Sequence, residues 1–223
     1  MRFVRENSLS LFFLVIFVLA LIAQSIAGHA MYNNDQLAHM AETVSYWRYI
    51  VSSEFGQAVM ENWQSEYLQF TLYIGTTVWL FQRGSPESKP PEKIGTDSDA
   101  EQHVGEHARA DSPKWARTRG LALWLYSNSL LLLMVAIWLA SWFAQSVTGW
   151  SAYNANQLEH HQSTVGWLGY IGSADFWQAT LQNWQSEFLA VGSMAVLSIY
   201  LRQRGSPESK PVGASHEATG VES

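Results

Sequence analysis

SLSLFFLVIFVLALIAQSIA, residues 8–27, contains no charged side chain and consists mostly of Leu, Ile, Phe, Val and Ala. A helix of about 20 such residues is long enough to cross the roughly 30 Å hydrocarbon core of a bilayer. The stretch therefore predicts an α-helix that spans a membrane. It also has the layout of a signal peptide, because basic Arg2 and Arg5 precede it and small residues stand at its end.

Residues 121–147 (LALWLYSNSLLLLMVAIWLASWFAQSV) form a second uncharged stretch, and it runs into AQSVTG where the first runs into AQSIAG. Since a segment in the middle of a chain is not a signal peptide, this similarity favours retention of both stretches as spans. Two more uncharged stretches, Tyr67–Phe81 and Phe188–Leu201, follow the repeated motif NWQSE, which completes each to roughly 20 residues. The expected fold is an all-α membrane protein with four transmembrane helices.

An internal repeat organises the chain. A shift of 121 residues aligns Asn7–Lys89 with Asn128–Lys210 without a gap, and nearly half of the aligned residues are identical, including AQS, NWQSE and RGSPESK. Each copy holds two spans, so both copies enter the membrane with the same orientation, as a tandem parallel duplication of a two-helix unit. The predicted divisions are a first two-span repeat (1–89), a cytoplasmic linker with the entry to the third span (90–127), a second two-span repeat (128–210) and a disordered tail (211–223).

The positions of the basic residues predict the orientation. Of the 13 Lys and Arg residues, all except Arg48 lie in the N-terminal tail, the middle of the chain or the C-terminal tail. By the positive-inside rule, both termini and the linker are cytoplasmic, and the loops 28–61 and 148–182 face outward. These loops are rich in aromatic residues, and we expect short interfacial helices in them, with Ser53 as an N-cap before the acidic Glu54.

Composition excludes several classes of function. The chain has 223 residues, no Cys and a formal net charge of −6, so it forms no disulfide or thiolate metal site and has no basic face for nucleic acid. The stretch HVGEH at 103–107 imitates a zinc peptidase motif, but Gly105 and linker-like surroundings do not favour the helix that the motif needs. We therefore expect a protein that is not an enzyme and has no cofactor.

One polar cluster is the main candidate site. Asn62 and Glu66 of the first NWQSE share a helix face, and a carboxylate inside a membrane almost always faces the bundle interior or water. The helical rise places Gln24 of the neighbouring span at a similar depth. The expected site for a small cation or polar solute comprises Glu66, Glu187, Asn62, Asn183, Gln24 and Gln145. The alternative is structural, with the same residues joining the helices through hydrogen bonds.

A metal site has a weaker signal. His39 and His160 match between the two copies and lie on the outer side, where they are the candidate ligands for a metal or haem together with the two Glu residues. Surface loops often contain histidines without any metal. The sequence therefore leaves the metal unknown.

RGSPESK closes both copies. Its Arg suits an anchor at the inner headgroups, and its Gly and Pro end a helix. A helix stop explains RGSP but not the exact repetition of ESK, so a non-catalytic scaffold that binds a cytoplasmic protein is the alternative function. The lipid bilayer is the expected partner, and the sequence leaves open whether the chain forms a homo-oligomer.

With NWQSE, RGSPESK and AQS-x-x-G placed, the chain resembles an uncharacterised family of bacterial integral membrane proteins, known only as a domain of unknown function. The resemblance covers the whole chain. It implies a multi-pass protein of the bacterial inner (plasma) membrane. It implies no activity, and the ligand, any transport, the oligomeric state and the role of the duplicated Glu residues stay open.

Overall fold

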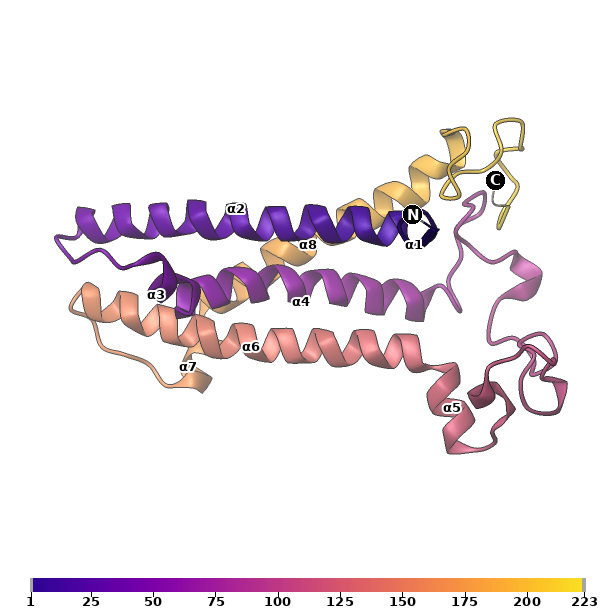
Figure 1. Cartoon of the computed structure of the whole chain (residues 1–223), viewed down its shortest axis with the longest axis horizontal. Coiled ribbons are helices and arrows are strands. Elements are labelled where there is room, and N and C mark those ends of the chain that lie inside the picture. Colours follow the sequence, from indigo (N-terminus) through magenta and orange to yellow (C-terminus); the bar gives the residue numbers. More distant parts are fainter. Residues whose placement is uncertain (1, 222–223) are drawn as a thin grey trace. The chain divides into compact units, whose positions relative to one another are not determined.

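The computed structural model describes residues 2–221 and is all-helical over that range, with no strand (Figure 1). Its α-helices are α1 (Arg2–Glu6), α2 (Ser8–Ala38), α3 (Tyr46–Ile50), α4 (Ser53–Thr76), α5 (Leu121–Ser127), α6 (Ser129–Glu159), α7 (Trp167–Ile171) and α8 (Ala174–Tyr200). Three short 3₁₀ turns, η1 (Pro91–Lys93), η2 (Gly105–His107) and η3 (Lys114–Arg117), lie between α4 and α5. The expected all-α fold is confirmed.

Two of the helices have the length and composition of membrane spans. Helices α2 and α6 each have 31 residues, and both contain a long window that is strongly apolar and almost free of charge. At about 1.5 Å per residue, each is roughly 46 Å long, which exceeds the thickness of the hydrocarbon core. Leu9, Phe13 and Leu19 on α2 are exposed on the protein, as lipid-facing side chains are.

The helices recur at the spacing of the sequence repeat. Helices α2 and α6 have the same length and begin 121 residues apart, at Ser8 and Ser129, and α3 and α7 have the same length and the same offset. Helix α4 starts at Ser53 and α8 at Ala174, again with this offset. The short helices predicted in the two connections are therefore present, one in each.

Helices α2 and α6 end in the same Schellman motif. In the first, the N–H of Ala41 donates to the carbonyl of Gln36 and the N–H of Met40 to that of Leu37. Met40 consequently has a φ of 59°, a left-handed conformation that glycine adopts most easily. His161 occupies the same position after α6, with a φ of 57°.

The start of α4 differs by one residue from the sequence prediction. Ser53 is the first residue of the helix rather than its cap, and the side chain of Ser52 accepts the bond from the N–H of Phe55. Ser173 caps α8 in the same way through Phe176. An acidic residue is present in the first turn of both helices, where its negative charge interacts favourably with the positive end of the helix dipole.

The chain divides into two compact units. The first contains the residues up to Met60 together with Ala144–Phe176, and the second contains Glu61–Phe143 and the residues from Trp177 on. In the first unit, the beginning of α4 approaches α6 closely, because a side chain at Gly56 would contact the Thr148 methyl group. In the second, α4 contacts α6 where Gly75 meets Leu131.

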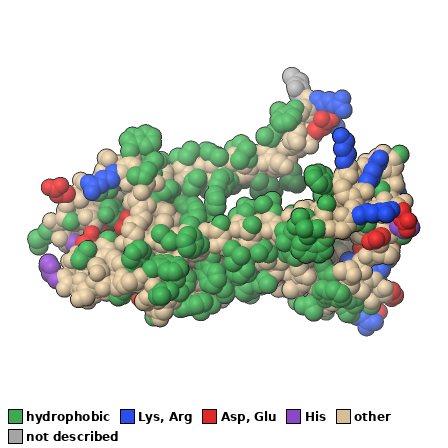
Figure 2. All heavy atoms as spheres, turned by 90° about the horizontal axis from the view of Figure 1, so that it is seen from below, with side chains coloured by type: hydrophobic (Ala, Val, Ile, Leu, Met, Phe, Trp, Pro, Cys, Tyr) green, Lys and Arg blue, Asp and Glu red, His purple; other side chains and the backbone are tan. Residues whose placement is uncertain are grey.

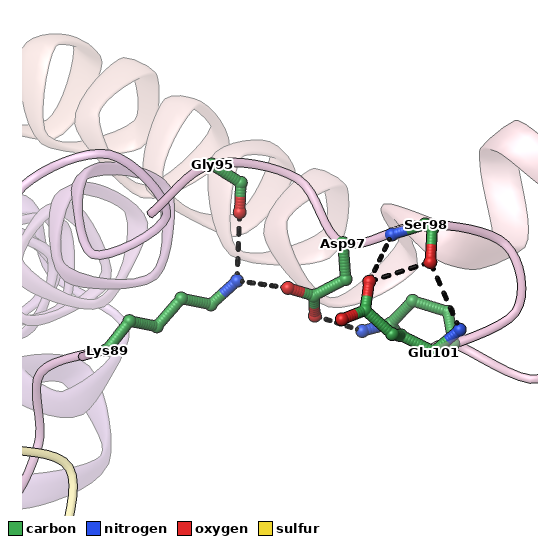
Figure 3. A network of polar contacts seen from close by, with 6 residues as sticks. Lys89, Gly95, Asp97, Ser98 and Glu101 are labelled. Atoms are coloured by element: carbon green, nitrogen blue, oxygen red, sulfur yellow. Dashed lines mark hydrogen bonds and ion pairs between the residues drawn. The ribbon is translucent and has the colours of Figure 1, made fainter. Parts of the chain in front are cut away.

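The segment between α4 and α5 contains an ion pair between Lys89 and Asp97. Lys89 Nζ lies 2.9 Å from the carboxylate of Asp97 and donates a 2.9 Å bond to the carbonyl of Gly95 (Figure 3). Beside it, the Glu101 carboxylate accepts bonds from the N–H and hydroxyl of Ser98. The contact with Lys89 lowers the pKa of Asp97 below its ordinary value.

Candidate functional site

Each connection in the first unit is tied to its preceding helix by an asparagine. The side chain of Asn33 accepts a 2.8 Å bond from the N–H of Val44 and donates a 3.0 Å bond to its carbonyl. Asn154 makes the same pair of bonds with Val165, at 2.9 Å each. Because an amide side chain satisfies both backbone groups at once, each connection is fixed against its helix at one defined residue.

A tyrosine from each short helix then packs against a glycine. A Cβ at Gly28 would collide with the hydroxyl of Tyr49, and one at Gly149 would collide with that of Tyr170. Both tyrosines are buried. The glycine that follows AQS therefore has a physical role in both halves of the chain, because only a residue without a side chain leaves room for the ring.

Further aromatic rings surround these two tyrosines. Tyr32 lies 5.7 Å from Tyr49 between ring centroids, and Tyr153 lies 5.5 Å from Tyr170. Phe55 and Phe176 complete the two groups, each 5.6 Å from its tyrosine. Rings at these distances and tilts attract one another beyond their burial alone.

A cavity of about 390 Å³ opens between these elements, within the first unit. It is lined by Tyr32, Asp35, Gln36, Glu54, Gln57, Gly149, Ala152, Tyr153, Ala155, Asn156, Glu159, Tyr170 and Asp175. Three pairs of these residues correspond at the repeat spacing: Tyr32 with Tyr153, Asp35 with Asn156, and Glu54 with Asp175. We call this cavity the acidic pocket.

The acidic pocket has a strongly negative lining. Four carboxylates line it, and no Lys or Arg does. Gln36 donates a 3.0 Å bond to Glu159, so this carboxylate is oriented by a neutral group. Burial, followed by the nearby Glu54 carboxylate, raises the pKa of Tyr49. Carboxylates together with tyrosine rings are suited to a cation, which the first attract by charge and the second by their π faces.

The structure brings the two predicted metal candidates together without further ligands. The rings of His39 and His160 meet edge to face with centroids 5.2 Å apart. Each Nδ1 lies 2.9 Å from the carbonyl four residues earlier, that of Asp35 or Asn156. Within residues 2–221, no group of three or more His, Asp or Glu side chains is arranged to hold a metal ion.

The predicted Glu66 and Glu187 both lie in the second unit. They are close enough for their charges to repel, and the Ser65 hydroxyl is placed against the Glu187 carboxylate. Glu66 is exposed and Glu187 half-buried. Asn183 donates a 2.9 Å bond to the carbonyl of Ala179 within its own helix, and Asn62 is exposed.

Gln24 and Gln145 belong to the first unit. Gln24 is exposed and Gln145 is completely buried. Their expected role as partners of the two glutamates stays a prediction.

The two NWQSE motifs contact each other. Trp184 Nε1 of the second motif donates a 2.7 Å bond to Oε1 of Gln64 in the first. Gln64 is completely buried, and the Trp184 ring lies 5.9 Å from that of Trp142. At least two of the motif's residues therefore join helices α4 and α8, which supports a structural role for this part of the motif.

The two RGSPESK motifs also form hydrogen bonds within the chain. Ser88 and Ser209 each accept a bond from the backbone N–H six residues earlier, that of Gln82 or Gln203. Lys210 is buried, and its ammonium donates a 2.6 Å bond to the carbonyl of Gly84 in the first motif. These bonds explain why Ser and Lys follow Pro-Glu in both motifs.

The C-terminal segment wraps around the first of these motifs. The N–H of Gly84 donates a 2.8 Å bond to the hydroxyl of Thr219, and the N–H of Gly220 donates a 3.0 Å bond to the carbonyl of Ser85. Gly84 has a φ of 85°, and a side chain there would collide with the carbonyl of His216. The two chain segments thus form one small folded region within the second unit.

The family described as Domain of unknown function (DUF6766) matches residues 1–221. The chain belongs to this family. The resemblance to a domain of unknown function that covers the whole chain is thereby confirmed. Neither a curated protein nor a solved structure matches the chain.

Membership of the DUF6766 family assigns no activity to the chain. The acidic pocket was not predicted. Its signal was nevertheless present in the sequence, because Tyr32 recurs as Tyr153 and the acid at 54 recurs at 175. In the sequence, Glu54 indicates only the start of a helix, since the sequence does not show that two distant connections line one cavity.

Proposed function

We propose that the chain is a non-enzymatic, multi-pass membrane protein that binds a small organic cation in the acidic pocket. Helices α2 and α6 are two of its spans, and α4 and α8, which begin at matching positions, are the other two. This is a tandem parallel duplication of a two-helix unit. Figure 2 supports the membrane location, because hydrophobic side chains cover much of the surface seen there.

The proposed location is the bacterial inner membrane, with both termini and the segment between α4 and α5 in the cytoplasm. The distribution of basic residues supports this orientation, since Arg48 is the only Lys or Arg in either of the connections that would face outward. In this orientation, the acidic pocket opens on the outer side. A site there is accessible to solutes that have not crossed the membrane.

The observation that carries the proposal is the composition of the pocket. Four carboxylates and three tyrosines line a cavity of about 390 Å³, with no basic residue among them. This volume lies in the usual range for small-molecule sites. A bare divalent ion would leave most of this space unfilled, whereas an alkyl diammonium ion can contact carboxylates on both sides and place its methylene groups against the rings.

The test uses 1,4-diaminobutane as the probe and 1,4-butanediol as its uncharged analogue. We expect the diamine to raise the thermal midpoint of the purified protein in detergent, by an amount that grows with the logarithm of its concentration, because it binds only the folded state. The diol should have no effect. Calorimetric titration then checks that binding is saturable.

The matched variants change one charge at a time. Glu54→Gln and Asp175→Asn should each weaken binding of the diamine, and the double variant should not bind it. The control is Asp111→Asn, in the exposed segment between α4 and α5, which should bind the diamine as the unaltered protein does. Equal responses to diamine and diol, or full binding by the double variant, would contradict the proposal.

Glu66 and Glu187 of the second unit, with Asn62 and Asn183, are a second candidate for binding or conducting a cation. The proximity of the two carboxylates favours it, because a cation between them would relieve their repulsion. For a ligand site, Glu66→Gln should reduce cation-dependent stabilisation. For a structural role, Gln should be tolerated and Leu should destabilise.

A scaffold that docks a cytoplasmic protein through RGSPESK has less support. The bonds of Ser88, Ser209 and Lys210 are made inside the chain. A pull-down with the unaltered protein and with a Glu208→Lys variant tests it, because Glu208 is exposed and its carboxylate is free to face a partner.

A further inference from the structure

A second cavity lies within the second unit, between α4 and α8. Its volume is about 300 Å³, and its polar lining consists of Gln69, Tyr73 and Glu87. Val191 and Met194 of α8 line the opposite side. At roughly 30 Å³ per molecule, such a volume holds several waters.

The polar side chains of this cavity form a row along α4 and the segment that follows it. The hydroxyl of Tyr73 donates a hydrogen bond to the carboxylate of Glu87, which belongs to the first RGSPESK. Gln69 precedes Tyr73 by four residues, so both lie on one face of α4. Glu87, being part of the segment after α4, places a titratable group at the end of the cavity nearest that segment.

Gln69 gives an independent indication of water. Its Oε1 is buried and has no hydrogen-bond partner among the residues that the structure describes. A buried acceptor of this kind normally receives a bond from an ordered water or a ligand. Because Gln69 lines the cavity, a rotation of its amide that turns Oε1 toward the cavity would let a water there satisfy this atom.

The same face of α4 continues to Glu66, three residues before Gln69. A carboxylate thus stands at each end of the row, with an amide and a phenol between them. We propose that this cavity fills with water and carries protons along α4 between Glu87 and Glu66. A proton passes from the carboxyl group at one end through the intervening waters to the carboxylate at the other, with Tyr73 fixing the orientation of Glu87.

Only the first half of the chain has this row. The positions that correspond to Gln69 and Tyr73 in α8 are Ala190 and Met194. Neither side chain has a hydroxyl or amide group that could take part in a row of hydrogen bonds. Glu208 corresponds to Glu87 and lies within electrostatic range of Tyr73. A change at Glu208 therefore alters the charge near the row without altering the row itself.

The first experiment measures water access, and it rests on the proposed arrangement in which α8 spans the membrane. The chain has no Cys, so a thiol reagent reacts only with the single cysteine that is introduced. In lipid vesicles, Val191→Cys should react with a charged, water-soluble thiol reagent about ten-fold faster than Leu189→Cys, which is exposed outside the cavity, because the thiolate forms only in water.

The two ways of failing are distinguishable. If both cysteines are protected, the cavity is dry and the inference is overturned while the four-span arrangement stands. If both react rapidly, α8 is not in the membrane, and the proposed spans fail together with the inference.

The second experiment measures proton flux into vesicles that contain a pH-sensitive dye, driven by a potassium diffusion potential. The unaltered protein should carry protons above the level of empty vesicles. Tyr73→Phe and Glu87→Gln should each reduce the flux by about ten-fold or more, and Glu208→Gln should leave it unchanged. Absence of flux in the unaltered protein, or equal flux in Tyr73→Phe, would overturn the proposal.

Discussion

Trp184 Nε1 donates a 2.7 Å hydrogen bond to Oε1 of Gln64 and so joins the two NWQSE motifs directly. Trp184→Phe should destabilise the protein by about 1–3 kcal/mol, because the buried Gln64 acceptor loses its donor and the smaller ring leaves space. Thermal unfolding in detergent measures this. Trp115→Phe, at a largely exposed ring, is the control, and an equal loss in both variants would show that the bond contributes nothing.

Gly28→Ala and Gly149→Ala should each destabilise by about 1–3 kcal/mol, because the added methyl group collides with the hydroxyl of Tyr49 or Tyr170. Removing that hydroxyl in Gly28→Ala/Tyr49→Phe should restore part of the loss. Gly192→Ala, with open space around it, should be neutral or stabilising. A double variant no more stable than Gly28→Ala would exclude the collision as the cause.

Met40→Gly should stabilise the protein by about 0.5–1 kcal/mol, since it relieves a left-handed backbone conformation at an exposed side chain. Denaturant unfolding in detergent measures the change. Met31→Gly, at an exposed position inside α2, should cost about 1 kcal/mol instead. Loss of stability in both variants would mean that the Schellman turn after α2 is not formed.

The Lys89–Asp97 pair predicts a pH dependence. The bond from Lys89, with that from Gln102, lowers the pKa of Asp97 below its ordinary 3.8. Because the folded carboxyl group holds its proton less tightly than the unfolded one, the pair stabilises the fold above about pH 4 and ceases to do so as the pH falls through the lower folded value.

The Asp97 titration can be followed by the NMR shift of its carboxyl carbon. The midpoint should lie below 3.8 in the unaltered protein and rise toward this value in Lys89→Met. The same midpoint in both proteins would show that Lys89 does not set it.

Topology is tested with reporter fusions. Fusions after Lys89, within residues 95–115 and at the C-terminus should report cytoplasm, and one after Asn33 should report the outside, because the basic residues gather on one side. An odd number of spans between Asn33 and Tyr153 would contradict the prediction that the two copies have the same orientation in the membrane.

Much of the fold was predictable because its signals are local. Uncharged stretches predicted α2 and α6, and the acidic Glu54 predicted the first turn of α4. The residue at which α4 ends was harder to predict from the sequence. The helix stops at Thr76, short of the expected Phe81, within a run of β-branched residues where Thr77 bonds back to the carbonyl of Tyr73.

The candidate site was not predictable to the same degree. The sequence drew attention to Glu66 and Glu187 because carboxylates in oily segments are unusual. The acidic pocket depends instead on tertiary contacts, such as the approach of Tyr49 to Gly28 and the bond from Gln36 to Glu159, between residues distant in sequence. No spacing rule along a single helix reveals such contacts.

The bonds that Gly84 makes with Lys210 and Thr219 have a consequence for biosynthesis. Residue 84 leaves the ribosome long before residue 219 is synthesised, so these two bonds cannot form until the segment that contains Lys210 and Thr219 has also emerged. Contacts this distant in sequence form late, after local helices. Residues 210–219 therefore complete a structure begun at Gly84, and a ribosome-stalled chain that lacks them would leave the backbone groups of Gly84 without these two bonds.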